Sequence, residues 1–307
     1  NSCKNPNCPE CGSVDKEVWI HKQERFTLNV NYFHVVFTIP NELNVLCLMD
    51  PKFMYRALFT VSAETIKELS KDKKYLGAKI GFTSVLHTWG QNLSLHPHIH
   101  MIVPGGGIDS NGKWKSSKKK FFLPVKVVSK LFKGKFLSYT KKNFDQRKIK
   151  DEEQFQNVID ACYSKNWVVY TKKPMKSAKH VVKYLGRYTH RIAISNARIK
   201  KYEDNKVTFS YKDYSDHNKI KEMTLKDTEF FRRYMMHVLP SNFMKIRHYG
   251  FLGNRNKEER IQAIRTATNT KDLAPLLIDY EQIISDILKR DVSICIKCGQ
   301  KRHRQLE

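Results

Sequence analysis

The sequence predicts an α+β fold built on a mainly antiparallel central sheet. Three runs of β-branched and aromatic residues, at 32–39, 78–89 and 96–103, have the composition of buried strands. Residues 51–70 instead carry apolar side chains at helical spacing and open with Pro51, which favours a long helix. This mixture of strand runs and separate amphipathic helices is typical of α+β proteins.

Proline, glycine and capping residues set the expected boundaries. Pro40 ends the first strand, and Pro104 followed by three glycines ends the strand at 96–103. A helix is expected at 152–166, followed by a strand at 167–172 and a second helix at 177–191 that is capped by Ser177. A β-hairpin is expected at 197–214, with its turn at Glu203–Asn205. A last helix is expected at about 225–238, opened by Thr224 and Asp227 in near capping-box spacing.

The chain is expected to divide into three units. Residues 1–25 hold three cysteines and little helix or strand pattern, which suits a small metal-stapled module. The strand and helix runs with the most informative motifs fall in 26–200, and 201–307 forms a basic α+β region. A length of 307 residues is ample for this division.

The composition indicates a polyanionic partner. Lys and Arg number 56 against 30 Asp and Glu, a net charge of +26. Nucleic acid is the commonest partner of such a surface, although a membrane surface or ribosomal RNA would satisfy the same charge balance. At 40% hydrophobic residues the chain is too apolar to be disordered, and no apolar run approaches the roughly 18 residues of a membrane span. Seven cysteines, five of them near the two ends, argue against a disulfide framework and favour a reducing, cytoplasmic setting.

The segment HPHIHMIV (96–103) carries the strongest chemical signal. His98 and His100 lie two apart on a strand, so their side chains share one face while Ile99 faces the core. Neutral imidazole is a common ligand of divalent metals, and two imidazoles on one rigid strand make a metal clamp. The sequence therefore predicts a metal site on this strand.

A third ligand is expected from the preceding strand. His87 lies near its end, where a short connection and antiparallel pairing would bring it beside the histidine pair. Gln91 and His96 are alternatives for the same place.

Two tyrosines mark the predicted helix at 177–191. Tyr184 and Tyr188 lie four apart, so their side chains share one helix face. Gly186 between them is costly in a helix interior, which indicates that something approaches closely. A tyrosine pair by itself also fits core packing, but the histidine strand and the charge favour a functional role. Basic residues expected to contact nucleic acid surround the pair: Lys183, Arg187 and Arg191.

These motifs resemble those of a known family. HPHIHMIV, the upstream YFHVVFTIP and the downstream KYLGRYTHR are similar to segments of the His-hydrophobic-His (HUH) single-strand endonucleases. LHTWGQNLSLHPHIH, VPGGG, YLGRYTHRIAISN and IRHYGFL resemble more closely the two-tyrosine transposases of rolling-circle insertion sequences, the insertion-sequence 91-like family. The resemblance extends from the N-terminal cysteines to about residue 255. It implies a central antiparallel sheet that carries the His strand, with the Tyr helix laid against it.

The resemblance also implies a reaction. His98 and His100 would hold Mg²⁺ or Mn²⁺ at the scissile phosphate, and Tyr184 and Tyr188 would attack single-stranded DNA to leave a 5′-phosphotyrosine and a free 3′-OH. The expected protein is a bacterial, cytoplasmic transposase that acts on single-stranded DNA at the element ends and the target. Alternatives are a plasmid or phage rolling-circle replication initiator, and a catalytically dead zinc DNA-binding protein.

The N-terminal cysteines resemble the family's zinc-binding region. Cys3, Cys8 and Cys11 supply three ligands, and structural Zn²⁺ takes four, so the fourth is expected upstream of the first residue or at His21. The Cys-x2-Cys pair at 295–298 is a second half-site, which could join the N-terminal cysteines or belong to a C-terminal knuckle.

Residues 114–142 interleave lysines with aromatic residues. Lysines there could follow a phosphate backbone while Trp114, Phe121, Phe122 and Phe136 stack on bases. A solvated lysine face over buried aromatic side chains fits the same pattern.

Overall fold

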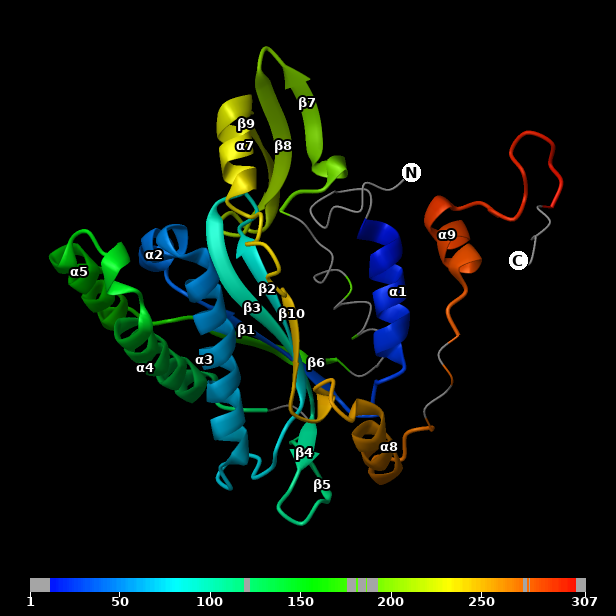
Figure 1. Ribbon diagram of the computed structural model, residues 1–307, viewed down its shortest axis with the longest axis horizontal. Coiled ribbons are helices and arrows are strands. Elements are labelled where there is room, and N and C mark those ends of the chain that lie inside the picture. The colour runs from blue at the N-terminus through cyan, green and yellow to red at the C-terminus, as the bar shows by residue number, and fades with distance from the viewer. Residues whose placement is uncertain are drawn as a thin grey trace.

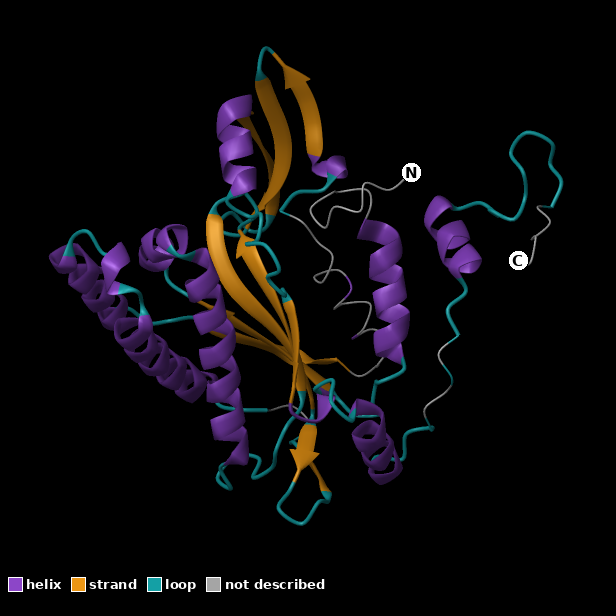
Figure 2. Cartoon of the chain, viewed as in Figure 1, coloured by secondary structure: helices purple, strands orange, loops and turns teal. Residues whose placement is uncertain are grey.

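The computed structural model describes residues 12–118, 122–175, 193–272 and 277–301, together with Val181, Gly186 and Pro275 (Figure 1). Its α-helices are α1 (Gly12–Glu24), α2 (Asn44–Met49), α3 (Pro51–Lys71), α4 (Val125–Asn143), α5 (Glu152–Ser164), α7 (Asp227–Met235), α8 (Lys257–Ala267) and α9 (Tyr280–Leu288). Its strands are β1 (Tyr32–Thr38), β2 (Phe82–Trp89), β3 (Leu95–Pro104), β4 (Gly106–Ile108), β5 (Trp114–Ser116), β6 (Val169–Met175), β7 (Ile199–Glu203), β8 (Lys206–Asp213), β9 (Lys219–Lys226) and β10 (Ile246–Tyr249). The predicted α+β class is confirmed (Figure 2).

A five-stranded antiparallel sheet forms the centre of the molecule, in the order β10-β2-β3-β1-β6. β2 and β3 are joined by the tight turn at 90–94, which makes them a hairpin. The edge strand β10 comes from the region expected to form a separate C-terminal unit, so the central sheet draws on the chain as far as Tyr249.

Helices α2 to α5 cover one face of this sheet (Figure 1). The alternating residues Phe33, Phe37, Ile99 and Met101 point into that layer and are at most 1% exposed. The predicted inward orientation of Ile99 is therefore confirmed. Burial of these large side chains contributes to the apolar core between the sheet and the helices.

The long helix α3 starts where the sequence predicts. The Asp50 carboxylate accepts a hydrogen bond of 2.9 Å from the Phe53 amide, and Pro51 occupies the first helical turn, where its missing N–H costs nothing. Its apolar stripe lies in the core against the sheet.

The opposite face of the sheet is covered by α1 and by residues of the predicted tyrosine segment. Val181 is 1% exposed and forms a cluster with Tyr32, Val85 and Ile102 from three adjacent strands. Trp19 of α1 packs against the same cluster. This is the face that carries the histidines.

Three local expectations were wrong. Residues 12–24 form the helix α1, although 1–25 was expected to be irregular. The sequence of α1 is only weakly amphipathic, and the helix is stabilised by packing against the sheet. Thr224 lies in the unpredicted strand β9, whose alternating Met223 and Leu225 pack on β8 and α7. Helix α7 begins at Asp227 with no side-chain cap.

Two of the four aromatic residues expected to stack on bases are buried in the core and unavailable for stacking. Phe122 and Phe136 are 5% and 0% exposed in the main core, and Trp114 packs against Phe251 with ring centroids 5.9 Å apart. Phe121 lies outside the described residues. The lysines of α4 are therefore a solvated face over buried aromatic rings. Over the part of the chain with assigned structure, no helix has the length and apolarity to cross a membrane.

Candidate metal centre on the β2–β3 hairpin

The register of the hairpin brings the predicted histidines together. His87 in β2 pairs directly with His98 in β3, and Val85 pairs with His100. Directly opposed residues of an antiparallel pair point to the same face, and so do residues two apart on one strand. The predicted placement of His87 beside His98 and His100 is confirmed.

The three rings form a compact nitrogen cluster. One ring nitrogen from each of His87, His98 and His100 lies within 4.8 Å of the others. The ring centroids are 5.4 Å apart for His87 and His98, 4.6 Å for His87 and His100, and 4.8 Å for His98 and His100. A cation with metal–nitrogen bonds of about 2.0–2.1 Å needs its ligand nitrogens within about 4.2 Å of one another, so binding requires the three rings to close slightly around it.

The ring of His98 is prepared to bind a cation. Its Nδ1 lies 2.6 Å from the His96 carbonyl oxygen, so the Nδ1–H donates and the electron pair remains on Nε2. Desolvation of His98 lowers its pKa to about 4, despite the opposing effect of that hydrogen bond. The imidazole is neutral near pH 7, as a metal ligand must be.

Neither alternative third ligand is placed as well as His87. Gln91 donates from Nε2 to the Tyr214 hydroxyl at 3.2 Å. His96 has its ring centroid 5.2 Å from that of His98, but its side chain is exposed and is not one of the three clustered histidines. The geometry therefore favours His87.

His34 belongs to the same array and was not singled out by the sequence. Its Nε2 lies 2.8 Å from His100 Nδ1, and the two rings are nearly parallel with an interplanar angle of 11°. Period-two alternation in YFHVVFT puts His34 on the face opposite Phe33, and this pattern could have placed His34 on the histidine face from the sequence alone. The register between β1 and β3, which decides that it meets His100, was not predictable.

A second lobe holds the turn of the hairpin. It consists of the three-stranded sheet β7-β8-β9 and α7, and it projects beyond the central sheet (Figures 1 and 2). Three side chains of the lobe and its flanking residues donate to consecutive carbonyls of the turn: Arg198 to Gln91, Arg233 to Asn92 at 3.3 Å and His237 to Leu93 at 3.1 Å.

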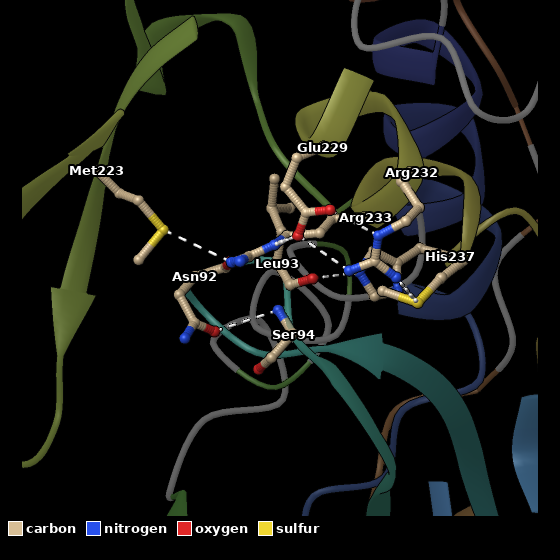
Figure 3. Close-up of polar contacts among 9 residues, drawn as sticks. Asn92, Leu93, Ser94, Met223, Glu229, Arg232, Arg233 and His237 are labelled. Atoms are coloured by element: carbon tan, nitrogen blue, oxygen red, sulfur yellow. Dashed lines mark hydrogen bonds and ion pairs between the residues drawn. The ribbon is translucent and has the colours of Figure 1, made fainter. Parts of the chain in front are cut away.

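Glu229 of α7 completes this arrangement by orienting Arg233, whose Nε lies 2.7 Å from the carboxylate (Figure 3). Leu93 is fully buried in the core of the lobe and adopts a positive φ of 62°. A non-glycine residue is held in that conformation only by its surroundings. The lobe therefore fixes the turn between the two histidine strands.

The predicted nucleophiles lie outside the described residues, and so do the basic residues beside them: Tyr184, Tyr188, Lys183, Arg187 and Arg191. Val181 and Gly186 of the same segment are helical and buried. Val181 packs on Ile102, which is two residues from His100.

The predicted zinc ligands Cys3, Cys8 and Cys11 also lie outside the described residues. The alternative ligand His21 is exposed in the third turn of α1, 4.0 Å from a Glu24 carboxylate oxygen. The Cys-x2-Cys pair at 295–298 forms a tight turn, closed by a 2.9 Å hydrogen bond from the Gly299 amide to the Cys295 carbonyl, and neither cysteine forms a disulfide with another described residue.

Comparison with known families defines the class of protein first. A family model described as "Putative transposase" matches residues 81–260, more than half of the chain, and a model described as "Transposase zinc-binding domain" matches residues 1–39. The first match contains the histidine hairpin and the second contains the N-terminal cysteines.

Two curated proteins are similar along nearly the whole chain. "Putative transposase y4qJ" of Sinorhizobium fredii is 39% identical over 98% of this chain and 79% of its own length. "Transposase for insertion sequence element IS801" of Pseudomonas savastanoi pv. phaseolicola is 28% identical over 98% of this chain and 74% of its own length. The chain belongs to the IS91-like family of transposases.

Among solved structures, the metal-free complex of the conjugative relaxase TrwC with OriT DNA overlaps 53% of this chain and 67% of its own, at 13% identity and a TM-score of 0.30.

Proposed function

We propose that this transposase cuts and rejoins single-stranded DNA at the ends of a rolling-circle insertion sequence by metal-dependent tyrosine transesterification. The observation that carries the proposal is the cluster of three histidine nitrogens within 4.8 Å, held on one rigid hairpin. A divalent cation at such a cluster, next to a tyrosine, is the minimum that phosphodiester cleavage by this route needs.

The donor set fits a divalent metal. His87, His98 and His100 offer neutral imidazoles, and the His98 electron pair is directed to Nε2 by the His96 carbonyl. Imidazole suits the later first-row transition metals best; of the two expected ions, Mn²⁺ is the weakest member of that series, whereas Mg²⁺ lies outside it and prefers oxygen ligands. We therefore expect this site to bind Mn²⁺ more tightly than Mg²⁺. When bound, the cation would neutralise charge developing on the phosphoryl oxygens.

The chain itself supplies the nucleophile. In the proposed step the phenolic oxygen of Tyr184 or Tyr188 forms a bond to phosphorus and loses its proton. The bond from phosphorus to the 3′ oxygen breaks, and that oxygen leaves as a 3′-OH after taking up a proton. One phosphodiester linkage is exchanged for another, so the cut strand can be rejoined without ATP.

Two tyrosines give the chain two attachments. While one holds a cut 5′ end as phosphotyrosine, the other can cleave a second strand, which suits strand transfer. Val181, three residues before Tyr184, supports their nearness to the metal site, because it belongs to the same buried cluster as Ile102 of the histidine strand.

The remaining assignments follow the same proposal. Lys183, Arg187 and Arg191 would contact the phosphates around the scissile bond. Cys3, Cys8 and Cys11 would bind structural Zn²⁺, in keeping with the zinc-binding family model that covers them.

The test uses the purified protein and synthetic DNA from the two ends of its own element. With Mn²⁺ and single-stranded oligonucleotides we expect a covalent protein–DNA adduct that survives denaturing electrophoresis. The adduct should be absent with EDTA and with the same sequence as a duplex. Equal cleavage with EDTA, or equal cleavage of the duplex, would contradict the proposal.

A further inference from the structure

We infer that His34 is a positioning residue that holds the proton of His100 on Nδ1 and thereby makes His100 Nε2 a metal ligand. The inference rests on the proposed function, because it gives His34 a task only where the histidine cluster binds a cation. It goes beyond that function by assigning a role to a fourth histidine, which does not bind the metal itself but orients the metal ligand His100.

The contact between the two side chains is close and shielded. His34 and His100 are 3% and 8% exposed, on the neighbouring strands β1 and β3. Their nitrogens are 2.8 Å apart, a normal hydrogen-bond length. Nearly parallel rings, at 11°, allow the N–H of one ring to lie in the plane of the other.

The position of one proton decides what His100 can do. In a neutral pair, only one of the two facing nitrogens carries hydrogen. If His100 Nδ1 donates to His34 Nε2, the electron pair of His100 lies on Nε2. If His34 donates instead, His100 must carry its proton on Nε2 and cannot coordinate a cation through that nitrogen.

The neighbouring ligand His98 has its Nδ1 proton fixed in a similar way, by a hydrogen bond to an acceptor. His98 donates its Nδ1–H to the carbonyl of His96, a group that can only accept. His100 has His34 in the corresponding place. Hydrogen bonds of this kind to ligating histidines fix the ring and raise its basicity, and their loss typically weakens metal binding about 10- to 100-fold.

The first measurement is Mn²⁺ affinity by titration calorimetry on the full chain without DNA. His34→Leu removes the acceptor while keeping an apolar fill, and we expect about 10- to 100-fold weaker binding. His34→Gln, whose amide oxygen can accept from His100, should recover most of the loss. His248→Leu is the matched control: His248 bonds to Thr83 on a neighbouring strand, lies outside the cluster, and should leave the affinity unchanged.

The second measurement reads the proton directly, by long-range ¹H–¹⁵N NMR of the imidazole nitrogens in the metal-free protein. We expect His100 as the Nδ1–H tautomer in the parent and in His34→Gln, and a shift toward Nε2–H in His34→Leu. A parent His100 protonated on Nε2 would overturn the inference whether or not the protein binds Mn²⁺, and so would full Mn²⁺ affinity in His34→Leu. Failure of the proposed function appears separately, as a parent that forms no DNA adduct.

Discussion

A Cβ atom built on Gly186 would lie 2.3 Å from Ile20 Cδ1 and 2.6 Å from Ile20 Cγ1. Glycine is therefore what allows the tyrosine-bearing segment to lie against α1, and the sequence-based expectation of a close approach at Gly186 is confirmed. This contact joins α1 to the segment whose Val181 belongs to the buried cluster on the histidine face of the sheet.

The Gly186–Ile20 contact can be tested by stability. Gly186→Ala should lower the free energy of unfolding by up to about 2 kcal/mol, because overpacking of the buried Ile20 side chain costs about 1–3 kcal/mol and the helix-propensity gain of alanine offsets up to about 1 kcal/mol of it. Gly134→Ala is the control: it lies within α4 with no atom within 4 Å of the added Cβ, and should be neutral or stabilising by up to about 1 kcal/mol. Urea unfolding of both variants measures the difference. Equal stabilities would show that the two segments do not pack as described.

Removal of the histidine pair should separate cleavage from DNA binding. We expect His98→Ala with His100→Ala to abolish Mn²⁺ binding and DNA cleavage. Most of the DNA affinity should remain, because it depends on lysine and arginine contacts to phosphates. Calorimetry, a cleavage assay and salt-dependent binding on one preparation give all three readouts. Undiminished cleavage in the double variant would contradict a metal role for this strand.

The third ligand can be identified by comparing two neighbours in the hairpin. His87→Ala should weaken Mn²⁺ binding far more than Gln91→Ala, because His87 faces His98 while Gln91 bonds to Tyr214. Both variants are compared by the same titration. If His87→Ala retains the parent affinity, the third ligand must be sought elsewhere.

Two neighbouring arginines test whether the lobe formed by β7-β8-β9 and α7 supports the hairpin turn. Arg232 and Arg233 both bind Glu229, but only Arg233 also reaches the Asn92 carbonyl. We expect Arg233→Ala to cost roughly 1–2 kcal/mol of unfolding free energy and to weaken Mn²⁺ binding, since a hydrogen bond from a charged group to a fixed turn is lost. Arg232→Ala, which removes an exposed ion pair, should change stability by less than about 1 kcal/mol. Similar losses in the two variants would mean that the lobe does not support the metal site.

Local patterns predicted four of the five strands of the central sheet, the helices α3, α5 and α7, the β7–β8 hairpin and part of the site. Strand alternation and a short turn were enough to place His87 beside His98, because a hairpin fixes its own register. Helix α3 was predictable from Pro51 and an apolar stripe.

The parts that escaped prediction depend on distant segments. His34 meets His100 across 66 residues, and Arg233 reaches the turn at Asn92 across 141. No local pattern encodes which strand lies next to β1 or which lobe packs on the turn. Strand β9 was missed because only alternate residues of a short polar segment are partly buried.

The central claim is that tyrosine oxygens of this chain attack DNA at the metal site. Its most direct test is denaturing-gel detection of the protein–DNA adduct, with Mn²⁺ and single-stranded element ends, for Tyr184→Phe, Tyr188→Phe and the double variant. Only one hydroxyl at a time can lie in line with the scissile bond. Each single variant should therefore keep some adduct but lose complete strand transfer, and the double variant should form none while still binding DNA. An adduct that persists in the double variant would contradict the account, because another side chain would then be the nucleophile.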